Sequence, residues 1–359
     1  MLHLILRKCF NSLLVVFGVI CVVFLLFNVL PGDPARMVLG QRADLSSIET
    51  INRELGRDLP MHLQFLRYLN DVSPVSILNH ADTTSRFYAD PVRYGGMLKL
   101  ARFGKNILVV KTPYLGRSYQ SREKVLTILW DSLPGTVVLA FSALAFAAFV
   151  GILLGVASAV SYRSASDQFI MVLSVIGMSV PSFFAGILMA WFFGFVLRDY
   201  TGLEMTGSLY EVDPFDGLQI AWKNLVLPAL TLGIRPLAVI VQLTRSSMLD
   251  VLAADFVRTA RAKGLSPLVV IFKHALRNAL NPVVTALSGW LGSLLAGAVF
   301  IEYIFGWKGV GKVTVDALEQ YDFPVVMGAV LMVSVFFVVI NIVVDIIYAR
   351  LDPRVRISG

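Results

Sequence analysis

The stretch of this sequence closest to a reactive motif is glycine-rich and lies near residue 310. It runs from Gly306 to Val313 and reads Gly-Trp-Lys-Gly-Val-Gly-Lys-Val. A phosphate-binding loop uses a similar spacing of glycine and lysine, but its last position is Ser or Thr, whose hydroxyl binds magnesium. Val313 has no hydroxyl, and no strand-like segment precedes the stretch. We therefore expect no nucleotide site here.

The other side chains that commonly serve enzymes are few and scattered. No two of the four histidines have helical ligand spacing, and the sequence contains neither His-Glu-x-x-His nor Gly-x-Ser-x-Gly. Cys9 and Cys21, the only cysteines, would lie roughly 18 Å apart on one helix, too far apart to pair with each other. We expect no catalytic residue, no metal site and no cofactor in this chain.

The informative polar residues lie inside apolar stretches. A charge at the bilayer centre costs at least about 2.5–3.5 kcal/mol unless it faces protein or water. Arg235 precedes Pro236, which we expect to prevent a regular helix, and Ser179-Val180-Pro181-Ser182 interrupts another apolar stretch. We interpret Ser179, Pro181, Ser182 and Arg235 as candidates to line a pathway. The alternative for Arg235 is a structural ion pair with Asp345 or a contact at a dimer seam.

The elements that carry these residues follow from composition. Hydrophobic residues make up 57% of the chain and charged residues only 15%, and the mean hydropathy is +0.74. Apolar runs of about 20 residues, the length of a membrane span, recur without the alternation of barrel strands. The sequence therefore predicts an all-α polytopic membrane protein with six transmembrane helices. The runs are Phe10 to Leu30, Leu133 to Tyr162, Gln168 to Leu197, Asn224 to Thr244, Ala279 to Ile301 and Pro324 to Val344.

Basic residues in the short loops predict the orientation. With the N-terminus in the cytoplasm, twelve Lys and Arg residues lie in cytoplasmic segments and four in the opposite short loops. Both termini are then cytoplasmic. The first run is longer than a signal-peptide core, so we interpret it as a retained span. The net charge of +7 is spread over several loops, which argues against nucleic acid as a partner.

The expected domains are three consecutive regions. Residues 1–30 form the N-terminal cytoplasmic segment and first helix, and residues 132–359 form the transmembrane core. Between them, residues 31–131 make a large extracytoplasmic loop with weakly amphipathic segments at Ser47 to Leu55 and Met61 to Leu69. The part from Asn79 to Lys111 shows no clear period. We expect this loop to be a cap over the helices or a docking surface.

The cytoplasmic segment 248–278 has the pattern of a short helical hairpin. Leu252, Phe256 and Ala260 recur every four residues with Val257 beside them, and Gly264 follows as a helix C-cap. Ser266 and Pro267 then predict the start of a second helix. Without a partner such a segment would lie on an anionic membrane surface, and with one it would be a contact site.

These residues resemble a known family. Arg258-Thr259-Ala260 before Gly264 resembles the coupling loop of permease subunits of ABC transporters of the dipeptide, oligopeptide and nickel class. The resemblance covers nearly the whole chain in order. It includes Leu30 to Pro34, Leu115 to Tyr119, Leu225 to Leu230, Phe256 to Ser266, His274 to Asn278, Pro282, Glu302, Phe305 and Gly306, Gly309 to Gly311, Tyr321 to Pro324, Asn341, Asp345 and Leu351 to Arg354.

The resemblance implies a MetI-like permease in the inner membrane of a prokaryote, forming half of an ATP-driven import pathway for peptides or related solutes. It implies a second permease chain, two cytoplasmic ATPase subunits that bind ATP and magnesium, and an extracytoplasmic solute-binding protein. The coupling residues would be Phe256, Val257, Arg258, Ala260, Arg261, Lys263, Gly264 and His274. The sequence departs from the family by an insertion at about 79–113 and by Lys308 in place of a usual proline.

Two other classes remain open from the residues alone. A membrane-anchored scaffold or assembly protein would use the outer loop but would not need the Gly264 hairpin. An ATP-independent secondary carrier usually shows an internal repeat, and the two halves of this chain show no convincing one. The transported solute cannot be deduced from these motifs.

Overall fold

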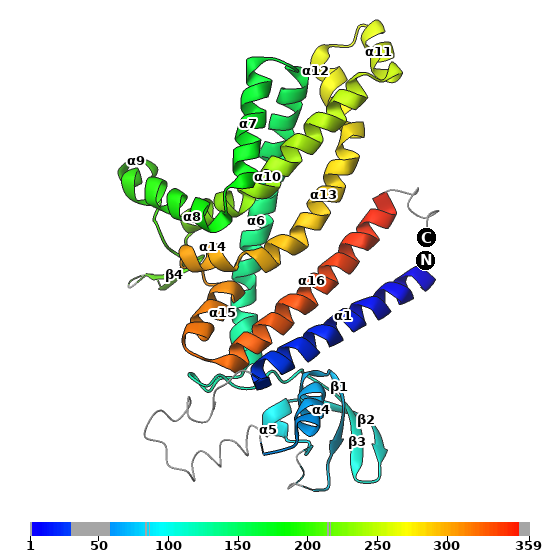
Figure 1. Ribbon diagram of the computed structural model, residues 1–359, viewed down its shortest axis with the longest axis vertical. Helices are drawn as coiled ribbons and strands as arrows, with labels where there is room; N and C mark the ends of the chain where they lie inside the picture. The colour runs from blue at the N-terminus through cyan, green and yellow to red at the C-terminus, as the bar shows by residue number, and fades with distance from the viewer. Residues whose placement is uncertain are drawn as a thin grey trace. The chain divides into compact units, whose positions relative to one another are not determined.

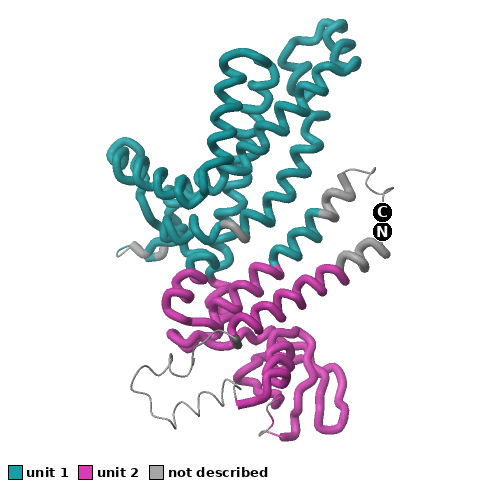
Figure 2. The backbone as a smooth tube through the Cα atoms, viewed as in Figure 1, with its two compact units in different colours: residues 1–5, 132–312, 336–359 teal, residues 6–131, 313–335 magenta. Residues whose placement is uncertain are grey.

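The computed structural model describes residues 2–29, 58–82, 85, 87–213, 215 and 217–351. The chain divides into two compact units, which Figure 2 colours separately. The first unit consists of residues 1–5, 132–312 and 336–359, and the second of residues 6–131 and 313–335. Several long helices, such as α6 and α16, begin in one unit and end in the other.

The second unit contains most of α1 and a small α/β subdomain. The subdomain combines α4 (Met61–Val72) and α5 (Pro91–Tyr94) with three strands, β1 (Val75–Asn79), β2 (Met97–Phe103) and β3 (Asn106–Lys111). The strands form an antiparallel sheet in the order β1-β3-β2, visible at the lower end of Figure 1. The sequence predicted an all-α chain with no clear period at 79–111, so that part of the prediction is wrong.

The sheet forms because β3 alternates. Ile107, Val109 and Lys111 point inward and the residues between them point out. Ile107 and Val109 pack with Leu78, Ala89 and Tyr94 in the core of the subdomain. A run of only six residues with a lysine at an inward position gives a weak period, which explains why the pattern did not predict a strand.

Helix α4 packs on α1 (Leu2–Val29) through aromatic rings. The ring of Phe24 lies 5.0 Å from that of Phe65 and 5.8 Å from that of Tyr68, measured between centroids. The weakly amphipathic segment from Met61 to Leu69 is helical, and the helix extends to Val72. The predicted segment Ser47 to Leu55 lies outside the described residues.

The remaining elements follow in chain order. They are α6 (Val125–Val160), α7 (Ala165–Ser179), α8 (Ser182–Trp191), the π-helix η1 (Phe192–Val196), α9 (Arg198–Thr201), β4 (Tyr210–Asp213), β5 (Gly217–Ile220), α10 (Lys223–Leu252), α11 (Asp255–Ala262), α12 (Pro267–Val269), the π-helix η2 (Val270–Ala275), α13 (Leu276–Gly297), α14 (Val299–Ile304), α15 (Val310–Glu319) and α16 (Phe323–Leu351).

Four helices in the described part of the chain, α1, α6, α10 and α16, are long and apolar enough to cross a membrane. A fifth span is possible if α7 is counted together with α8 and η1, but that pair is bent by 108°. We expected one kinked helix from Gln168 to Leu197. The break is sharper because Pro181 has no N–H and holds the preceding Val180 in an extended conformation, with φ −76° and ψ 127°.

Helix α10, in contrast, is not broken by its prolines. Pro228 and Pro236 both lie inside it, yet the helix runs without interruption from Lys223 to Leu252. The expectation that Pro236 prevents a regular helix is therefore wrong. Both prolines are buried, and neighbouring helices at membrane depth can satisfy the backbone groups that a proline leaves unpaired.

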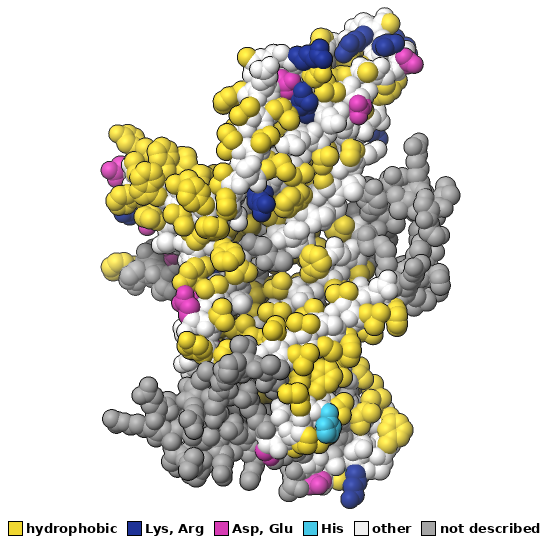
Figure 3. All heavy atoms as spheres, in the orientation of Figure 1, with side chains coloured by type: hydrophobic (Ala, Val, Ile, Leu, Met, Phe, Trp, Pro, Cys, Tyr) yellow, Lys and Arg dark blue, Asp and Glu magenta, His cyan; other side chains and the backbone are white. Residues whose placement is uncertain are grey.

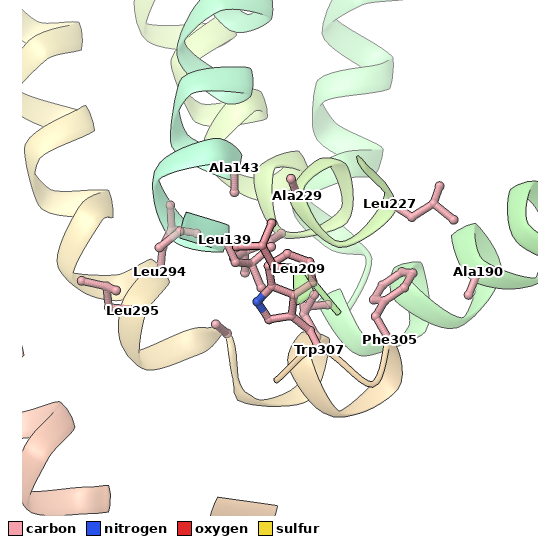
Figure 4. Packing of buried hydrophobic residues seen from close by; sticks show 14 residues of the cluster. Leu139, Ala143, Ala190, Leu209, Leu227, Ala229, Leu294, Leu295, Phe305 and Trp307 are labelled. Atoms are coloured by element: carbon pink, nitrogen blue, oxygen red, sulfur yellow. The ribbon is translucent and has the colours of Figure 1, made fainter. Parts of the chain in front are cut away.

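The first unit is held together by a hydrophobic cluster around Trp307 and Phe305 (Figure 4). Trp307 is completely buried, and its indole N–H donates a hydrogen bond of 2.9 Å to the carbonyl of Gly135 in α6. A side chain at Gly135 would collide with the carbonyl of Lys308, so this close approach requires glycine. The cluster fixes the loop after α14 against α6.

Candidate functional site

The strongest candidate site is the helical hairpin formed by α11, α12 and η2, which connects α10 with α13. Helix α11 ends at Ala262, and Gly264 reverses the chain with φ +75°, a left-handed conformation that favours glycine. Ser266 occupies the N-cap position of α12 and Pro267 its first turn, although the Ser266 hydroxyl makes no cap hydrogen bond. The predicted hairpin and its glycine turn are confirmed.

The hairpin has its own small core. Val257 and Ala260 are buried against Val270 of η2, with Val251 and Leu252 packed around them. The sequence suggested that Phe256, Val257 and Ala260 share one contact face. The structure places only Phe256 on the surface, where 44% of it is exposed, because α12 and η2 fold back over the other two.

The outer surface of the hairpin is cationic. Arg258, Arg261 and Lys263 are exposed, whereas His274 is half-buried. Figure 3 shows Lys and Arg side chains gathered at the end of the first unit that carries α11. Arg258 lies 3.4 Å from Asp255, but 73% and 95% of the two side chains are exposed, so this pair contributes little stability. The surface therefore combines these exposed positive charges with exposed apolar side chains, Phe256 among them.

The base of the hairpin is anchored in the helix bundle. Ala275 and Ala279 pack with Val156, Ala159 and Met248 in a buried cluster that joins η2 and α13 to α6 and α10. A displacement of the hairpin would therefore reach the transmembrane helices through packed side chains.

An ion pair that the sequence analysis did not identify lies close to this cluster along α10. Arg245 contacts Asp167, which also accepts hydrogen bonds from the Ser158 hydroxyl and the Arg163 backbone N–H. Asp167 is buried, and its backbone N–H donates to Ser164, the N-cap of α7. The spacing Ser164-x-x-Asp167 is a helix-start pattern and could have indicated the position of Asp167. Its partner Arg245 lies 78 residues away.

The candidate pathway residues lie at the α7–α8 break and in the middle of α10. Ser179 ends α7 and its hydroxyl donates to the Val175 carbonyl at 2.8 Å, while Pro181 and Ser182 begin α8. A Cβ at Gly177 would lie 3.2 Å from Ile234, the residue before Arg235, so the end of α7 lies against this part of α10.

Arg235 itself is exposed on the first unit, and its side chain makes no ion pair or hydrogen bond with the described residues. The side chain of Asp345, its possible partner, lies outside the described residues. Asn341, which shares a face with Asp345 in the sequence, donates to the Phe337 carbonyl at 2.9 Å.

The glycine-rich stretch at 306–313 binds a carboxylate of its own chain. Glu302 is completely buried, and one of its carboxylate oxygens accepts hydrogen bonds from the backbone N–H groups of Gly311, at 2.7 Å, and Lys312, at 3.1 Å. A side chain at Gly309 would overlap this carboxylate. The stretch thus forms an anion-binding turn at the start of α15, and Glu302 occupies it.

Similarity to solved structures defines the class of fold. The chain is similar to two inward-facing structures of the MetNI methionine ABC transporter, at TM-scores of 0.52 and 0.50 and sequence identities of 16% and 19%. Each match covers 63% of this chain and 97% of the other. These values establish that the chain shares the fold of these transporter chains.

The sequence comparisons define the family. Residues 151–357 match the model of the binding-protein-dependent transport system inner membrane component, and residues 1–84 match the N-terminal model for such membrane components. The chain belongs to this family. It is a permease component of a binding-protein-dependent transport system, which confirms the resemblance noted in the sequence.

Curated relatives match over nearly their full length. The di/tripeptide transport system permease protein DppB of Pseudomonas aeruginosa is 35% identical, with 95% of this chain and 94% of the relative covered. The probable D,D-dipeptide transport system permease protein DdpB of Escherichia coli is 34% identical, with 98% and 97% covered. The glutathione transport system permease protein GsiC of Salmonella paratyphi A is also 34% identical, with 99% of each chain covered.

Proposed function

We propose that this chain forms half of the translocation pathway of an ATP-driven importer for short peptides or closely related solutes. The names of its relatives, which transport dipeptides, tripeptides or glutathione, support this solute class. The partners are a second, homologous permease chain, two ATPase subunits that bind ATP and magnesium, and a solute-binding protein on the outer side.

The proposed topology has six spans with both termini in the cytoplasm. Helix α13 supplies the fifth span, and the bent pair of α7 with α8 and η1 supplies the third. The α/β subdomain then belongs to the large extracytoplasmic loop after α1. The loop from α10 to α13, with its many cations, faces the cytoplasm, as the positive-inside rule favours.

The observation that carries the proposal is the exposed Phe256 beside three exposed cations, on a hairpin that also exposes Leu268 and Phe272. An exposed aromatic ring surrounded by Arg258, Arg261 and Lys263 suits a cleft with an apolar floor and an acidic rim. An ATPase subunit with such a cleft would hold the hairpin, and the cluster around Ala275 and Ala279 would transmit its motion to α10 and α13.

The proposed path for the solute passes the α7–α8 break. Ser179, Pro181 and Ser182 lie where the backbone leaves the helical conformation, and such non-helical backbone at membrane depth lines cavities rather than lipid. Arg235 lies beside Ile234, which faces the end of α7, and would meet the carboxylate of a passing solute.

The test compares two Phe→Asp variants in membranes that contain all subunits. In Phe256→Asp, we expect the ATPase subunits to be lost from pull-downs and uptake of a radiolabelled dipeptide to fall more than tenfold. Phe215→Asp changes an equally aromatic residue that is 96% exposed in the β4–β5 turn, and it should retain the ATPase. Normal uptake and ATPase recovery in Phe256→Asp would contradict the proposal, and uptake that needs no ATPase would favour a secondary carrier.

A further inference from the structure

A cavity of about 320 Å³ lies within the second unit. Residues from the end of α1, from α4, from the segment before α6 and from the start of α16 line it. Its size is at the lower end of small-molecule pockets. None of the residues that we assign to coupling or to the translocation path takes part in it.

The lining of the cavity is positively charged. Arg67, Arg93, Arg117 and Arg122 contribute to it, against Asp71 as the one acidic residue among the described residues of the lining. Asp71 is already engaged, because it accepts hydrogen bonds from Arg93 at 2.5 Å and from the Tyr94 hydroxyl at 2.6 Å. The field inside the cavity therefore favours an anion.

Two buried donors on residues that line this cavity lack an acceptor among the described residues. These are the hydroxyl of Tyr68 and the Nε–H of Arg93. Arg93 is held in place, since one of its terminal guanidinium nitrogens binds Asp71 and its Cζ lies 4.7 Å from the centre of the Tyr114 ring. Buried donors are nearly always paired, so two of them on one cavity indicate an absent acceptor.

Another part of the lining is apolar. The rings of Phe27 and Phe323 lie 5.4 Å apart, and Phe24 joins them on the lining. A ligand that contacts both the cationic and the apolar part of the lining carries an anionic acceptor at one end and an apolar group at the other. A planar carboxylate can accept from a guanidinium and a hydroxyl at the same time.

We propose that this cavity binds a small organic carboxylate with an apolar side group, held by the Tyr68 hydroxyl and the Arg93 Nε–H. The binding site does not depend on the proposed transport function. If that function holds, the C-terminal end of a short peptide has this chemistry, and the cavity is an outer accessory site separate from the path.

The test measures binding to the full chain in lipid nanodiscs, so that it succeeds or fails independently of transport. The probes are N-acetyl-phenylalanine, its C-terminal amide and inorganic phosphate, by equilibrium dialysis at pH 7. We expect the acid to bind at least tenfold more tightly than the amide or phosphate. Equal binding of acid and amide, or phosphate binding as tight as that of the acid, would overturn the proposal.

The key variant is Tyr68→Phe, which removes only the unpartnered hydroxyl. It should weaken binding of the acid about tenfold without lowering the melting temperature, whereas Tyr88→Phe, in the same subdomain but outside the cavity, should change neither. Should Tyr68→Phe fail to fold, Arg117→Gln at an exposed part of the lining should weaken binding severalfold. Unchanged binding in both lining variants would refute the site.

Discussion

Arg245 donates two hydrogen bonds to the carboxylate of Asp167, from Nε at 2.7 Å and from the terminal guanidinium nitrogen at 2.9 Å. This bidentate pair joins α10 to the start of α7. Only 4% of the Asp167 side chain is exposed, against 22% for Arg245. The guanidinium also lies over the Tyr162 ring, at 5.3 Å from its centre. The pair therefore joins α10 to α7 and, through the Ser158 hydroxyl that also binds Asp167, to the end of α6.

Breaking this pair should strongly destabilise the chain. Arg245→Gln leaves Asp167 buried without its counter-charge, and we expect a loss of about 3–5 kcal/mol in the free energy of unfolding. The double variant Arg245→Gln with Asp167→Asn should recover part of this loss. The matched control is Arg198→Gln, which breaks an exposed pair with Glu204 and should cost less than about 1 kcal/mol. Thermal unfolding in detergent compares the three, and equal stability of both single variants would contradict the prediction.

The glycine turn of the hairpin should be essential for coupling. Gly264→Val forces a branched residue into a left-handed conformation at a cost of about 1–3 kcal/mol, although no atom lies within 4 Å of the added Cβ. We expect membrane insertion to persist and solute uptake to be lost. Gly202→Val imposes the same strain in a turn with φ +63° and an equally open environment. If both variants lose uptake equally, strain alone would explain the defect and coupling would not.

Arg235 should matter for transport more than for stability. Its side chain is exposed within the chain, so Arg235→Ala removes no buried pairing among the described residues. We expect folded yield to remain within about twofold and uptake of zwitterionic peptides to fall at least tenfold. Uptake of a C-terminally amidated peptide, which has no carboxylate at that end, should fall less. An equal loss of yield and uptake, rescued by Asp345→Asn, would instead favour the structural ion pair.

The subdomain that contains β1, β2 and β3 should respond to pH through Lys111. Burial, reinforced by Arg93 and opposed by Asp71, lowers the pKa of its ammonium from 10.5 to about 8. Between these values the unfolded chain binds more protons than the folded one, so stability should rise as the pH increases from about 8. Burial also raises the pKa of the Tyr94 hydroxyl, which opposes this gain above about pH 10.

Hydrogen exchange of the β3 amides between pH 7 and 9.5, corrected for intrinsic rates, measures this effect. Lys111→Met should remove the rise in protection, whereas Lys105→Met at the exposed β2–β3 turn should retain it. A β3 protection that does not change with pH in the unmodified chain would contradict the assignment.

The glycine-rich stretch should be structural. Glu302→Ala leaves the N–H groups of Gly311 and Lys312 without their buried acceptor, and we expect a loss of at least about 2 kcal/mol. The purified chain should hydrolyse no ATP, with or without this substitution. ATP hydrolysis that disappears in Lys312→Ala would contradict both the assignment of the stretch and the class of protein.

The sequence was most informative where the structure depends on residues that are adjacent along the chain. Gly264, Ser266 and Pro267 specify the hairpin turn by local backbone chemistry, and the structure has the turn at that place. The sequence could not show that Val257 is buried, because its cover, Val270, comes from the returning helix. It also could not pair Asp167 with Arg245 across 78 residues. Glu302 lies only nine residues before Gly311, but its role depends on a backbone turn that no pattern of side chains records.

The π turn of η2 (Val270–Ala275) determines how the hairpin is rotated about the helix axis relative to α13. A π turn holds about one residue more than an α-helical turn, and each α-helical residue advances the chain by about 100° around the axis. Side chains before η2, such as Leu268, are therefore rotated by about that angle relative to the side of α13 that packs on α10. Removal of one residue from η2 would barely shorten the hairpin, but it would rotate the exposed surface of the hairpin by about 100° relative to α13. The direction of that surface is thus encoded by a residue count, independently of which side chains the hairpin carries.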